Sequence, residues 1–383
     1  MDLARGLLLA QNVEKDDIVK PQLMLLNYLV LLTFCAGCSN EKSPKAEKMP
    51  DQQSSEGLNP DTSVAADQRN ANMSLAAFHT HSYFEKSKCT TLPSASFQLT
   101  SNYKPTNQLL INMVQRIAEL PSKEAMEKAL QPFGISSIQV FGKSTAGGFR
   151  GLLIESSIME LLVFRGTNNI VEGILDATFF QRNLKELGLP GRAHSGFVEH
   201  YIAFREEMLQ LVSQVRSKPL ILAGHSLGGS TILLAAAELD SKGVDIHSIY
   251  TAGAPRLGDQ ELTNMINKRF GQKYFRLEHM EDVVPHAPPL KTSSQVLAEL
   301  GADSFLKPMV DAGIKGANFA APAGKGIFFN EKGIQENVDD VLLDQSYWQK
   351  QARNGLLTFP LFIGMNIQNH IPRSYICGFG KNL

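Results

Sequence analysis

The stretch that decides the fold is Pro219-Leu-Ile-Leu-Ala-Gly-His-Ser-Leu-Gly-Gly229. Its apolar residues Leu220 to Ala223 have the pattern of a buried strand and run directly into a Gly-x-Ser-x-Gly box. The segment Ser230 to Leu239 behind the box is rich in Leu and Ala and predicts a helix. A serine on such a tight strand-to-helix turn presents its hydroxyl above the sheet, which makes Ser226 a candidate nucleophile.

The residues around Ser226 suit that role. Gly224 and Gly228 leave room for the turn, and Gly229 lets the helix pack close to the strand. The N–H of Leu227 and the helix dipole would face any negative charge that forms beside Ser226. The alternative is a glycine-rich turn in which Ser226 only caps a helix.

Strand and helix patterns alternate along the rest of the folded part. Helical spacing occurs over residues 107–130, with a break at Pro121, and over residues 197–215. Strands are expected at residues 138–141, 151–155, 159–164, 246–251 and 274–277, with a hairpin over 327–334. This alternation predicts an α/β fold, with a mainly parallel central sheet flanked by helices on both faces.

The composition and the motifs limit the classes of function that the chain can have. The chain has 383 residues, 43% of them hydrophobic and 20% charged, which suits one large globular domain with extra segments. Its net charge of −1 gives no reason to expect a nucleic-acid partner, and no obligate protein partner is evident. No nucleotide-binding motif is present, so no cofactor is predicted. The pair His79-Thr-His81 lacks the further ligands that a metal site needs.

The N-terminal part is expected to lie outside the folded domain. Residues 23–37 form a mostly apolar run, too short for a comfortable membrane span and typical of a secretory signal. The run ends in Phe34-Cys-Ala-Gly-Cys38, which resembles a bacterial lipoprotein box in which Cys38 is lipidated after cleavage. Plain secretion with cleavage nearby is the alternative, and translation could begin at Met24.

These features divide the chain into a signal peptide (residues 1–37), a disordered tether (38–75) and one catalytic domain (76–383). The tether is polar and charged, so it cannot bury enough apolar surface to fold. The expected location is a bacterial cell envelope, with a membrane anchor on Cys38, or the exterior if the protein is secreted.

The order of groups along the chain selects the partners of Ser226. In hydrolase folds with this turn, the acid follows the serine and the histidine follows the acid. His370 is the best base, since the other histidines precede Ser226 or crowd the candidate acids. Asp282 is the best acid because it lies just beyond a predicted strand end, where such sheets place functional loops. Glu281 and Asp259 are the other acid candidates, although Asp259 more readily caps the next helix.

One further histidine lies close to the chosen acid. His286 sits four residues after Asp282, where one short loop would struggle to present both groups. Oxyanion donors are also needed: the N–H of Leu227 is one, and Thr167, just after a predicted strand, offers both an N–H and a hydroxyl.

Six blocks of sequence, in this order, resemble the fungal-type (class 3) lipases of the α/β-hydrolase superfamily. The blocks are Phe164-Arg-Gly-Thr167, His194-Ser-Gly-Phe197, Gly224-His-Ser-Leu-Gly-Gly229, Thr251-Ala-Gly-Ala-Pro-Arg-Leu-Gly258, Asp282-Val-Val-Pro-His-Ala-Pro-Pro289 and His370. The resemblance implies the α/β-hydrolase fold, and it maps the catalytic residues onto Ser226, Asp282 and His370. It maps the oxyanion residue onto Thr167.

The resemblance implies a serine carboxylic ester hydrolase that cleaves acylglycerol esters at a lipid interface through an acyl-enzyme intermediate. A phospholipase A1 or a broad-specificity esterase would use the same residues, as would a transferase that passes the acyl group to an acceptor other than water. A non-catalytic envelope lipid-binding protein on the same fold is the alternative from a different class.

The resemblance also implies a lid after Thr167. Ile170, Ile174 and Leu175 fall on one side of a helix, which agrees with a lid but also suits an ordinary surface helix. The stretch of sequence between Asp282 and His370 is longer than the family leads us to expect. We predict an insert at residues 291–323, with a helix over residues 296–323.

Two cysteines remain in the folded domain. Cys89 and Cys377 lie near its two ends, so they could pair in an oxidising compartment or remain two buried thiols. A disulfide between the N- and C-terminal segments occurs in fungal members of the family, so the resemblance favours the pairing.

Overall fold

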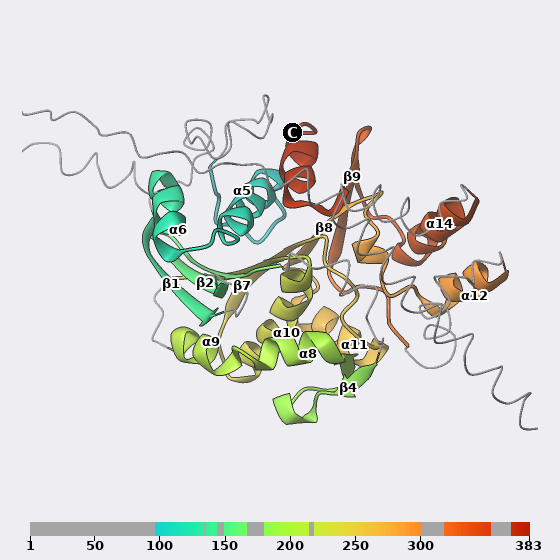
Figure 1. The fold of residues 1–383 in the computed structure, drawn as a ribbon, viewed down its shortest axis with the longest axis horizontal. Coiled ribbons are helices and arrows are strands. Elements are labelled where there is room, and N and C mark those ends of the chain that lie inside the picture. Colours follow the sequence, from blue (N-terminus) through green and yellow to red (C-terminus); the bar gives the residue numbers. More distant parts are fainter. Residues whose placement is uncertain are drawn as a thin grey trace, which may run out of the picture. The chain divides into compact units, whose positions relative to one another are not determined.

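An eight-stranded sheet organises the computed structural model of this chain (Figure 1). The structure describes residues 96–133, 135–143, 149–166, 180–213, 218–299, 318–353 and 369–383. All of them belong to one compact unit within Asp61–Leu383. In spatial order, the strands are β1 (Ile135–Lys143), β2 (Phe149–Ser156), β3 (Glu160–Phe164), β6 (Leu220–His225), β7 (Ile246–Ala252), β8 (Tyr274–His279), β9 (Lys325–Asn330) and β10 (Gly333–Glu336).

The middle of the sheet is parallel. Neighbouring strands from β3 to β9 pair in parallel, whereas β1, β2 and β10 pair antiparallel at the two edges. Every residue of β6 is buried, as expected for a strand that is covered on both faces. A separate two-stranded sheet joins β4 (Gln181–Asn183) to β5 (Arg192–His194). The predicted mainly parallel sheet and the predicted hairpin of β9 and β10 are confirmed.

Helices cover both faces of the sheet (Figure 1). One face carries α5 (Pro105–Ile117) and α6 (Lys123–Leu130), and the other carries α8 (Ser195–Ile202), α9 (Arg205–Val212), α10 (Leu227–Ser241) and α11 (Gln260–Phe270). Each face has its own hydrophobic core. Two further helices, α12 (Lys291–Glu299) and α14 (Asp340–Arg353), pack against each other near β9.

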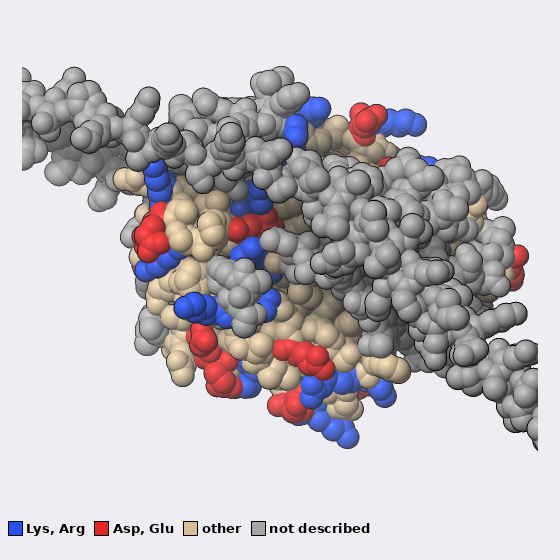
Figure 2. Space-filling model, in the orientation of Figure 1, with Lys and Arg blue, Asp and Glu red and all other residues tan. Residues whose placement is uncertain are grey.

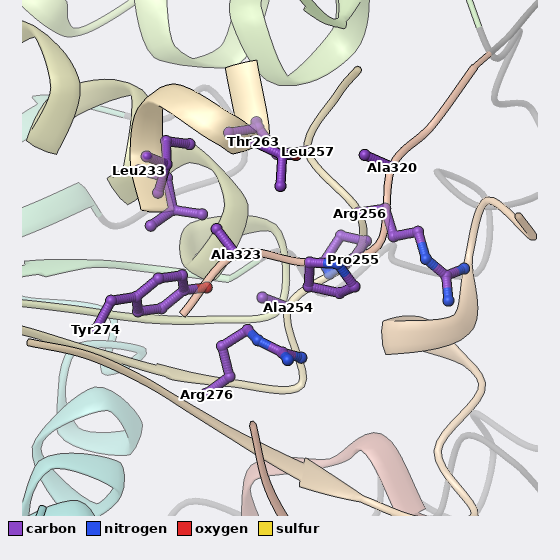
Figure 3. Close-up of a pocket in the computed structure, with 12 residues that line it drawn as sticks. Leu233, Ala254, Pro255, Arg256, Leu257, Thr263, Tyr274, Arg276, Ala320 and Ala323 are labelled. Atoms are coloured by element: carbon purple, nitrogen blue, oxygen red, sulfur yellow. The ribbon is translucent and has the colours of Figure 1, made fainter. Parts of the chain in front are cut away.

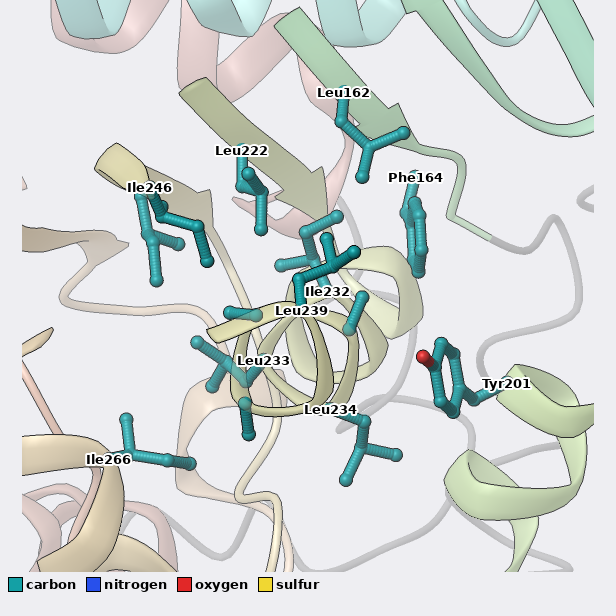
Figure 4. Close-up of a cluster of buried hydrophobic side chains, with 14 of the residues drawn as sticks. Leu162, Phe164, Tyr201, Leu222, Ile232, Leu233, Leu234, Leu239, Ile246 and Ile266 are labelled. Carbon is teal, nitrogen blue, oxygen red and sulfur yellow. The ribbon is translucent and has the colours of Figure 1, made fainter. Parts of the chain in front are cut away.

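Helix α10 is the centre of the second core (Figure 4). Residues 228–239 of this helix are all buried. Ile232 and Leu234 of α10 belong to the same cluster as Leu162 of β3, Leu222 of β6 and other apolar residues of that face. A helix that is buried on all sides is held from all sides, so the turn that begins it has a fixed place above the sheet.

The prediction of one continuous helix over residues 197–215 is wrong. The segment forms α8 and α9, and Phe204 between them has non-helical dihedral angles of φ −132° and ψ 3°. The buried ring of Phe204 lies 5.6 Å from the ring of Phe141 and 5.0 Å from that of Phe164. Packing of this ring into the core interrupts the helix, because tertiary contacts outweigh local helix propensity.

Two other expectations are met. The predicted break near Pro121 separates α5 from α6. Asp259 caps α11, and its side chain accepts a hydrogen bond from the N–H of Leu262 at 3.0 Å.

The inserted helix predicted over residues 296–323 is confirmed only at residues 296–299 and is wrong at residues 318–323. The helix α12 begins earlier, at Lys291, and ends at Glu299. Residues 318–323 form neither helix nor strand, and the N–H of Ala320 donates a hydrogen bond to the carbonyl of Gly258 at 2.9 Å. Backbone pairing with the loop after β7 replaces helical pairing in this stretch.

Within the described ranges, no helix is both long enough and apolar enough to cross a membrane. The same residues contain no group of three or more His, Cys, Asp or Glu side chains arranged to hold a metal ion. On the face drawn in Figure 2, the charged side chains of the described residues mix both signs rather than forming one large patch of a single sign.

Candidate active site

Ser226 lies on a strained turn between β6 and α10. Its dihedral angles are φ 59° and ψ −129°, and it is one of two non-glycine residues with positive φ among the described residues. Such a backbone conformation is unfavourable and persists only where the surrounding structure enforces it. The N–H of Ser226 donates to the carbonyl of Ala252 at 2.9 Å, which ties the turn to the end of β7.

Glycines make this turn possible. A Cβ atom on Gly224 would lie 2.2 Å from the carbonyl oxygen of Gly228, and a Cβ on Gly228 would lie 2.4 Å from that of Phe164. A Cβ on Gly229 would lie 2.7 Å from the Cβ of Ala254. These distances are shorter than van der Waals contact, so the three glycines expected to allow close packing are required for it.

The start of α10 lies next to Ser226. The N–H groups of Gly229 and Ser230 donate to the carbonyl of Ser226. Leu227 is the first residue of the helix, so its N–H has no acceptor within the helix. This N–H and the helix dipole can stabilise an anion beside Ser226.

Asp282 and His370 are in direct contact, although 88 positions separate them in the sequence. The Nδ1 atom of His370 lies 2.7 Å from Oδ2 of Asp282. A carboxylate only accepts, so Nδ1 carries the proton and Nε2 presents its lone pair. Both residues are buried, with 0% and 3% of their surface exposed.

Two further groups orient the carboxylate of Asp282. The hydroxyl of Tyr375 donates to Oδ2 at 2.7 Å, and the N–H of Val284 donates to Oδ1 at 2.9 Å. Burial, followed by the charge of Asp282, raises the pKa of Tyr375 well above its usual value, so the hydroxyl stays protonated and donates. The sequence reasoning did not identify Tyr375; its position five residues after His370 was the only available signal.

His370 lies beside the turn that carries Ser226. The Nε2 atom of the neighbouring His225 lies 3.0 Å from the carbonyl oxygen of His370, and the two imidazole rings stack with centroids 4.9 Å apart. Gly253 follows Ala252, which accepts the hydrogen bond from the N–H of Ser226. A Cβ atom on Gly253 would lie 3.0 Å from Cε1 of His370 and 3.1 Å from Oδ2 of Asp282, so His370 and Asp282 pack directly against this residue.

Two atoms of this cluster are unpaired within the described part of the chain. Oγ of Ser226 and Nε2 of His370 are both buried and have no hydrogen-bond partner there. The structure therefore brings Asp282 and His370 into hydrogen-bond contact but shows no hydrogen bond between Oγ of Ser226 and Nε2 of His370.

Behind Ser226, His225 is buried and neutral. Burial, reinforced by the nearby His370, lowers the pKa of His225 to about 3. Its Nδ1 atom lies 4.0 Å from a carboxylate oxygen of Glu119, whose own pKa is raised by burial against the opposing charge of Arg116. No sequence pattern marks Glu119 or indicates a role for His225.

A small cavity lies apart from these residues, between β8 and α11 (Figure 3). Arg276, Tyr274, Pro255 and Ala323 contribute to its wall, and none of Ser226, Asp282 and His370 does. Its volume of about 20 Å³ suits a water molecule rather than an acyl chain.

Several predicted residues lie outside the described residues. These are Thr167, the lid residues Ile170, Ile174 and Leu175, and the cysteines Cys38 and Cys89. The pairing of Cys89 with Cys377 therefore stays a prediction, as do the oxyanion role of Thr167, the lid and the lipid anchor. Of the other acid candidates, Asp259 caps α11, and Glu281 forms an exposed ion pair with Lys350 at 2.6 Å.

Sequence comparisons show that this chain is similar to lipases. Residues 161–292 match the family model of "Lipase (class 3)", a region that includes Ser226 and Asp282. A lipase of Rhizomucor miehei is 34% identical over 136 residues, which cover 33% of this chain and 37% of the relative. A secreted mono- and diacylglycerol lipase of Fusarium solani is 31% identical over 130 residues, covering 33% and 38%. The chain thus matches less than half the length of these relatives.

The similarity in fold to solved structures extends over a longer part of the chain than the similarity in sequence. A solved structure from a family of fungal lipases with an unusual buried polar cluster aligns with a TM-score of 0.50 and 19% sequence identity. The alignment covers 72% of this chain and 99% of that structure, and at this identity it speaks for the fold alone. Residues 161–292 are thus similar in sequence to class 3 lipases, and the fold of the chain is similar to that of a fungal lipase.

Proposed function

We propose that this protein is a serine carboxylic ester hydrolase that cleaves acylglycerol esters. The observation that carries the proposal is the hydrogen bond from Nδ1 of His370 to Asp282, which leaves Nε2 unpaired beside the strained turn of Ser226. The similarity to a secreted mono- and diacylglycerol lipase of Fusarium solani supports this substrate class.

In this mechanism, Oγ of Ser226 attacks the ester carbonyl carbon while Nε2 of His370 takes its proton. The proton then passes to the leaving alcohol, and an acyl-enzyme remains. Water attacks the acyl carbon, again with His370 as the base, and the freed acid leaves Ser226 in its starting state. Asp282 stabilises the imidazolium of both steps without taking a proton.

The oxyanion of each tetrahedral intermediate would accept a hydrogen bond from the N–H of Leu227 and a second one from Thr167. Loss of one donor in such a site costs about 100- to 1,000-fold in turnover. The first donor is favoured by the position of Leu227 at the start of α10, where its N–H has no helical acceptor.

Access to the serine would require movement of a covering segment. Ser226 is only 1% exposed, so an ester cannot contact Oγ in this state. We assign this covering role to the lid with Ile170, Ile174 and Leu175, whose apolar side would turn toward a lipid interface. The activity on a short-chain ester should then rise abruptly as the ester passes its solubility limit, and a smooth saturation curve would argue against the lid.

The envelope location belongs to the same proposal. A lipid anchor on Cys38, followed by the polar tether, would hold the enzyme at a membrane surface. Expression in a bacterial host, followed by mass spectrometry of the N-terminal peptide, should reveal diacylglyceryl-modified Cys38, whereas Cys38→Ser should be released unmodified. An unmodified wild-type cysteine after signal cleavage would favour plain secretion.

A fluorophosphonate probe tests the hydrolase itself. The wild-type protein should be labelled at Ser226, as located by peptide mass spectrometry, and Ser226→Ala should not be labelled. Parallel assays on triolein and phosphatidylcholine should show faster release of fatty acid from triolein; the reverse order would make the protein a phospholipase. Absence of labelling in the wild type would favour a lipid-binding protein without catalysis.

A further inference from the structure

The helix α14, which belongs to the long stretch between Asp282 and His370, carries a fully buried carboxylate, Asp344. Its Oδ1 accepts a hydrogen bond from Nη2 of Arg256 at 2.6 Å and lies 3.0 Å from Nδ1 of His286. Its Oδ2 accepts from the hydroxyl of Ser293 on α12 and from the N–H of Leu290 at 3.4 Å. One side chain thus binds α12 and both ends of the segment 286–290.

Arg256 holds the same segment from the other side. Its Nη1 donates to the carbonyl oxygens of His286 and Pro288, each at 2.5 Å. Its backbone N–H donates to the carbonyl of Ala287 at 2.9 Å. Without the carboxylate of Asp344, this guanidinium, 2% exposed, would lose its only ion-pair partner among the described residues.

The charge state of Asp344 fits this arrangement. Burial opposes its ionisation, but the charge of Arg256 and the hydrogen bonds from His286 and Ser293 outweigh burial and hold the pKa well below its usual value. A second residue of α14 also contacts this segment: the ring of Tyr347 stacks on that of His286, with centroids 4.0 Å apart and planes inclined by 5°.

The segment that Asp344 fixes is continuous with the catalytic acid. His286 ends a short 3₁₀ helix, Val284–His286, which begins two residues after Asp282. The N–H of Val284 at the start of this helix donates to Oδ1 of Asp282, and the other carboxylate oxygen binds His370. A displacement of His286 would therefore move Val284 and rotate the carboxylate against the imidazole.

We propose that Asp344 is a positioning residue for the triad: by clamping residues 286–290 between α14 and Arg256, it sets the orientation of Asp282 toward His370. The inference rests on the proposed hydrolase function. It also gives the long stretch between Asp282 and His370 a role, because α12 and α14 supply Ser293 and Asp344 to the clamp.

The same helix provides a matched control. Asp340, one turn before Asp344, forms an ion pair with Arg276 of β8, at 2.9 and 2.8 Å to its two oxygens. Arg276 is as buried as Arg256 but pairs with Glu278 and does not hold the segment 286–290. Loss of Asp340 should therefore weaken the docking of α14 without moving Asp282.

The experiment compares Asp344→Asn with Asp340→Asn in the full chain. Active sites are counted by fluorophosphonate titration, so that unfolded protein does not lower the apparent turnover. With p-nitrophenyl butyrate, Asp344→Asn should lose about 10- to 100-fold in kcat, since small misplacements of catalytic groups have effects of this size, with KM changed less than about threefold. Asp340→Asn should keep the wild-type kcat while its thermal midpoint falls.

The proton on Nδ1 of His370 gives a second readout that does not depend on hydrolysis. Its downfield NMR resonance reports the hydrogen bond to Asp282, and it should shift or broaden in Asp344→Asn but not in Asp340→Asn. A wild-type kcat together with an unchanged resonance in Asp344→Asn would overturn the inference.

A milder pair of variants covers the case in which Asp344→Asn does not fold. Ser293→Ala removes one donor to Asp344 and leaves the buried charges in place, so kcat should fall severalfold. Ser294→Ala is its control, because the equally buried hydroxyl of Ser294 has no hydrogen-bond partner within the described residues. Equal kcat in the two variants would contradict the clamp. Labelling that persists in Ser226→Ala would instead overturn the hydrolase function, which separates the two failures.

Discussion

At the scale of single residues, the site depends on the absence of side chains as much as on their presence. Ser226 keeps its positive φ because the chains around it approach more closely than any Cβ would allow. We expect Gly228→Ala to abolish soluble expression or lower the thermal midpoint severely, since the new Cβ would lie 2.4 Å from the backbone oxygen of Phe164. Gly196→Ala, near the start of α8, is the control: its Cβ meets only the side chain of His194, at 3.2 Å. Comparable midpoints for the two variants would contradict this view of the turn.

Tyr375 gives a second prediction at this scale. Tyr375→Phe should lower kcat by about 10-fold, because it removes one of the hydrogen bonds that hold Asp282 and such bonds to charged groups contribute about 1.5–3 kcal/mol. Tyr103→Phe should leave kcat unchanged, since that hydroxyl has no partner among the described residues. Steady-state kinetics on one ester compares them, and an unchanged kcat in Tyr375→Phe would show that its hydrogen bond is dispensable.

Some of these residues were predictable from the sequence and others were not. The Gly-x-Ser-x-Gly box and the serine–acid–histidine order pointed to Asp282 and His370, which the structure brings into contact. The order rule says nothing about which groups support the acid. Tyr375 and Asp344 act across large sequence separations, and no local pattern marks either of them. His286, set aside as too close to Asp282, is a partner of Asp344 instead.

At the scale of elements, the packing of α10 against the sheet forms the centre of the second hydrophobic core. Leu234 of α10 is fully buried in the second hydrophobic core (Figure 4), whereas Leu342 of α14 is 61% exposed. Leu234→Ala should lower the free energy of unfolding by about 2–5 kcal/mol. Leu342→Ala should change it by less than about 0.5 kcal/mol. Urea denaturation measures both, and equal losses would mean that α10 does not carry the core.

Element prediction succeeded where local patterns agree with packing. The β6 strand and α10 have apolar residues at most of the positions that the sheet and the helices bury, so their positions follow from the sequence. The 197–215 segment has helical periodicity throughout, but the burial of Phe204 against Phe141 and Phe164 breaks it into α8 and α9. The helix α14 was missed because its buried face consists of polar and aromatic residues, among them Asp344 and Tyr347, rather than an apolar stripe.

At the scale of the whole molecule, buried histidines make stability depend on pH. Burial lowers the pKa of His225, aided by His370, to about 3 and that of His194 to about 4. Between pH 6.5 and these values, the unfolded chain holds protons that the folded chain does not, so stability falls as the pH is lowered. Each histidine contributes a slope of about 1.4 kcal/mol per pH unit within this window.

Denaturation at several pH values from 6.5 to 5 measures this slope. His194→Gln should reduce it by about 1.4 kcal/mol per pH unit, since the variant has lost one of the groups that protonate only on unfolding. A slope identical to that of the wild type would mean that His194 titrates alike in both states.

The arrangement of the whole fold was largely predictable because strands and helices alternate along the chain and parallel strands need helical crossovers. The antiparallel edge formed by β9 and β10 was also predictable, whereas the antiparallel pairing of β1 and β2 depends on choices that no residue pattern reveals. The same holds for the docking of α14, which rests on its ion pairs with Arg256 and Arg276, and for that of α12, whose Ser293 donates to Asp344 of α14.

The central claim is that Ser226 and His370 act as one catalytic unit. The most direct test is a double-mutant cycle, in which the turnover of the wild type is compared with that of Ser226→Ala, His370→Ala and the double variant. The turnover of each single variant should fall about a million-fold. The turnover of the double variant should fall no further than that of either single variant, because the effects of substituting groups that act together are not additive. Losses that multiply in the double variant, or wild-type turnover in His370→Ala, would contradict the account.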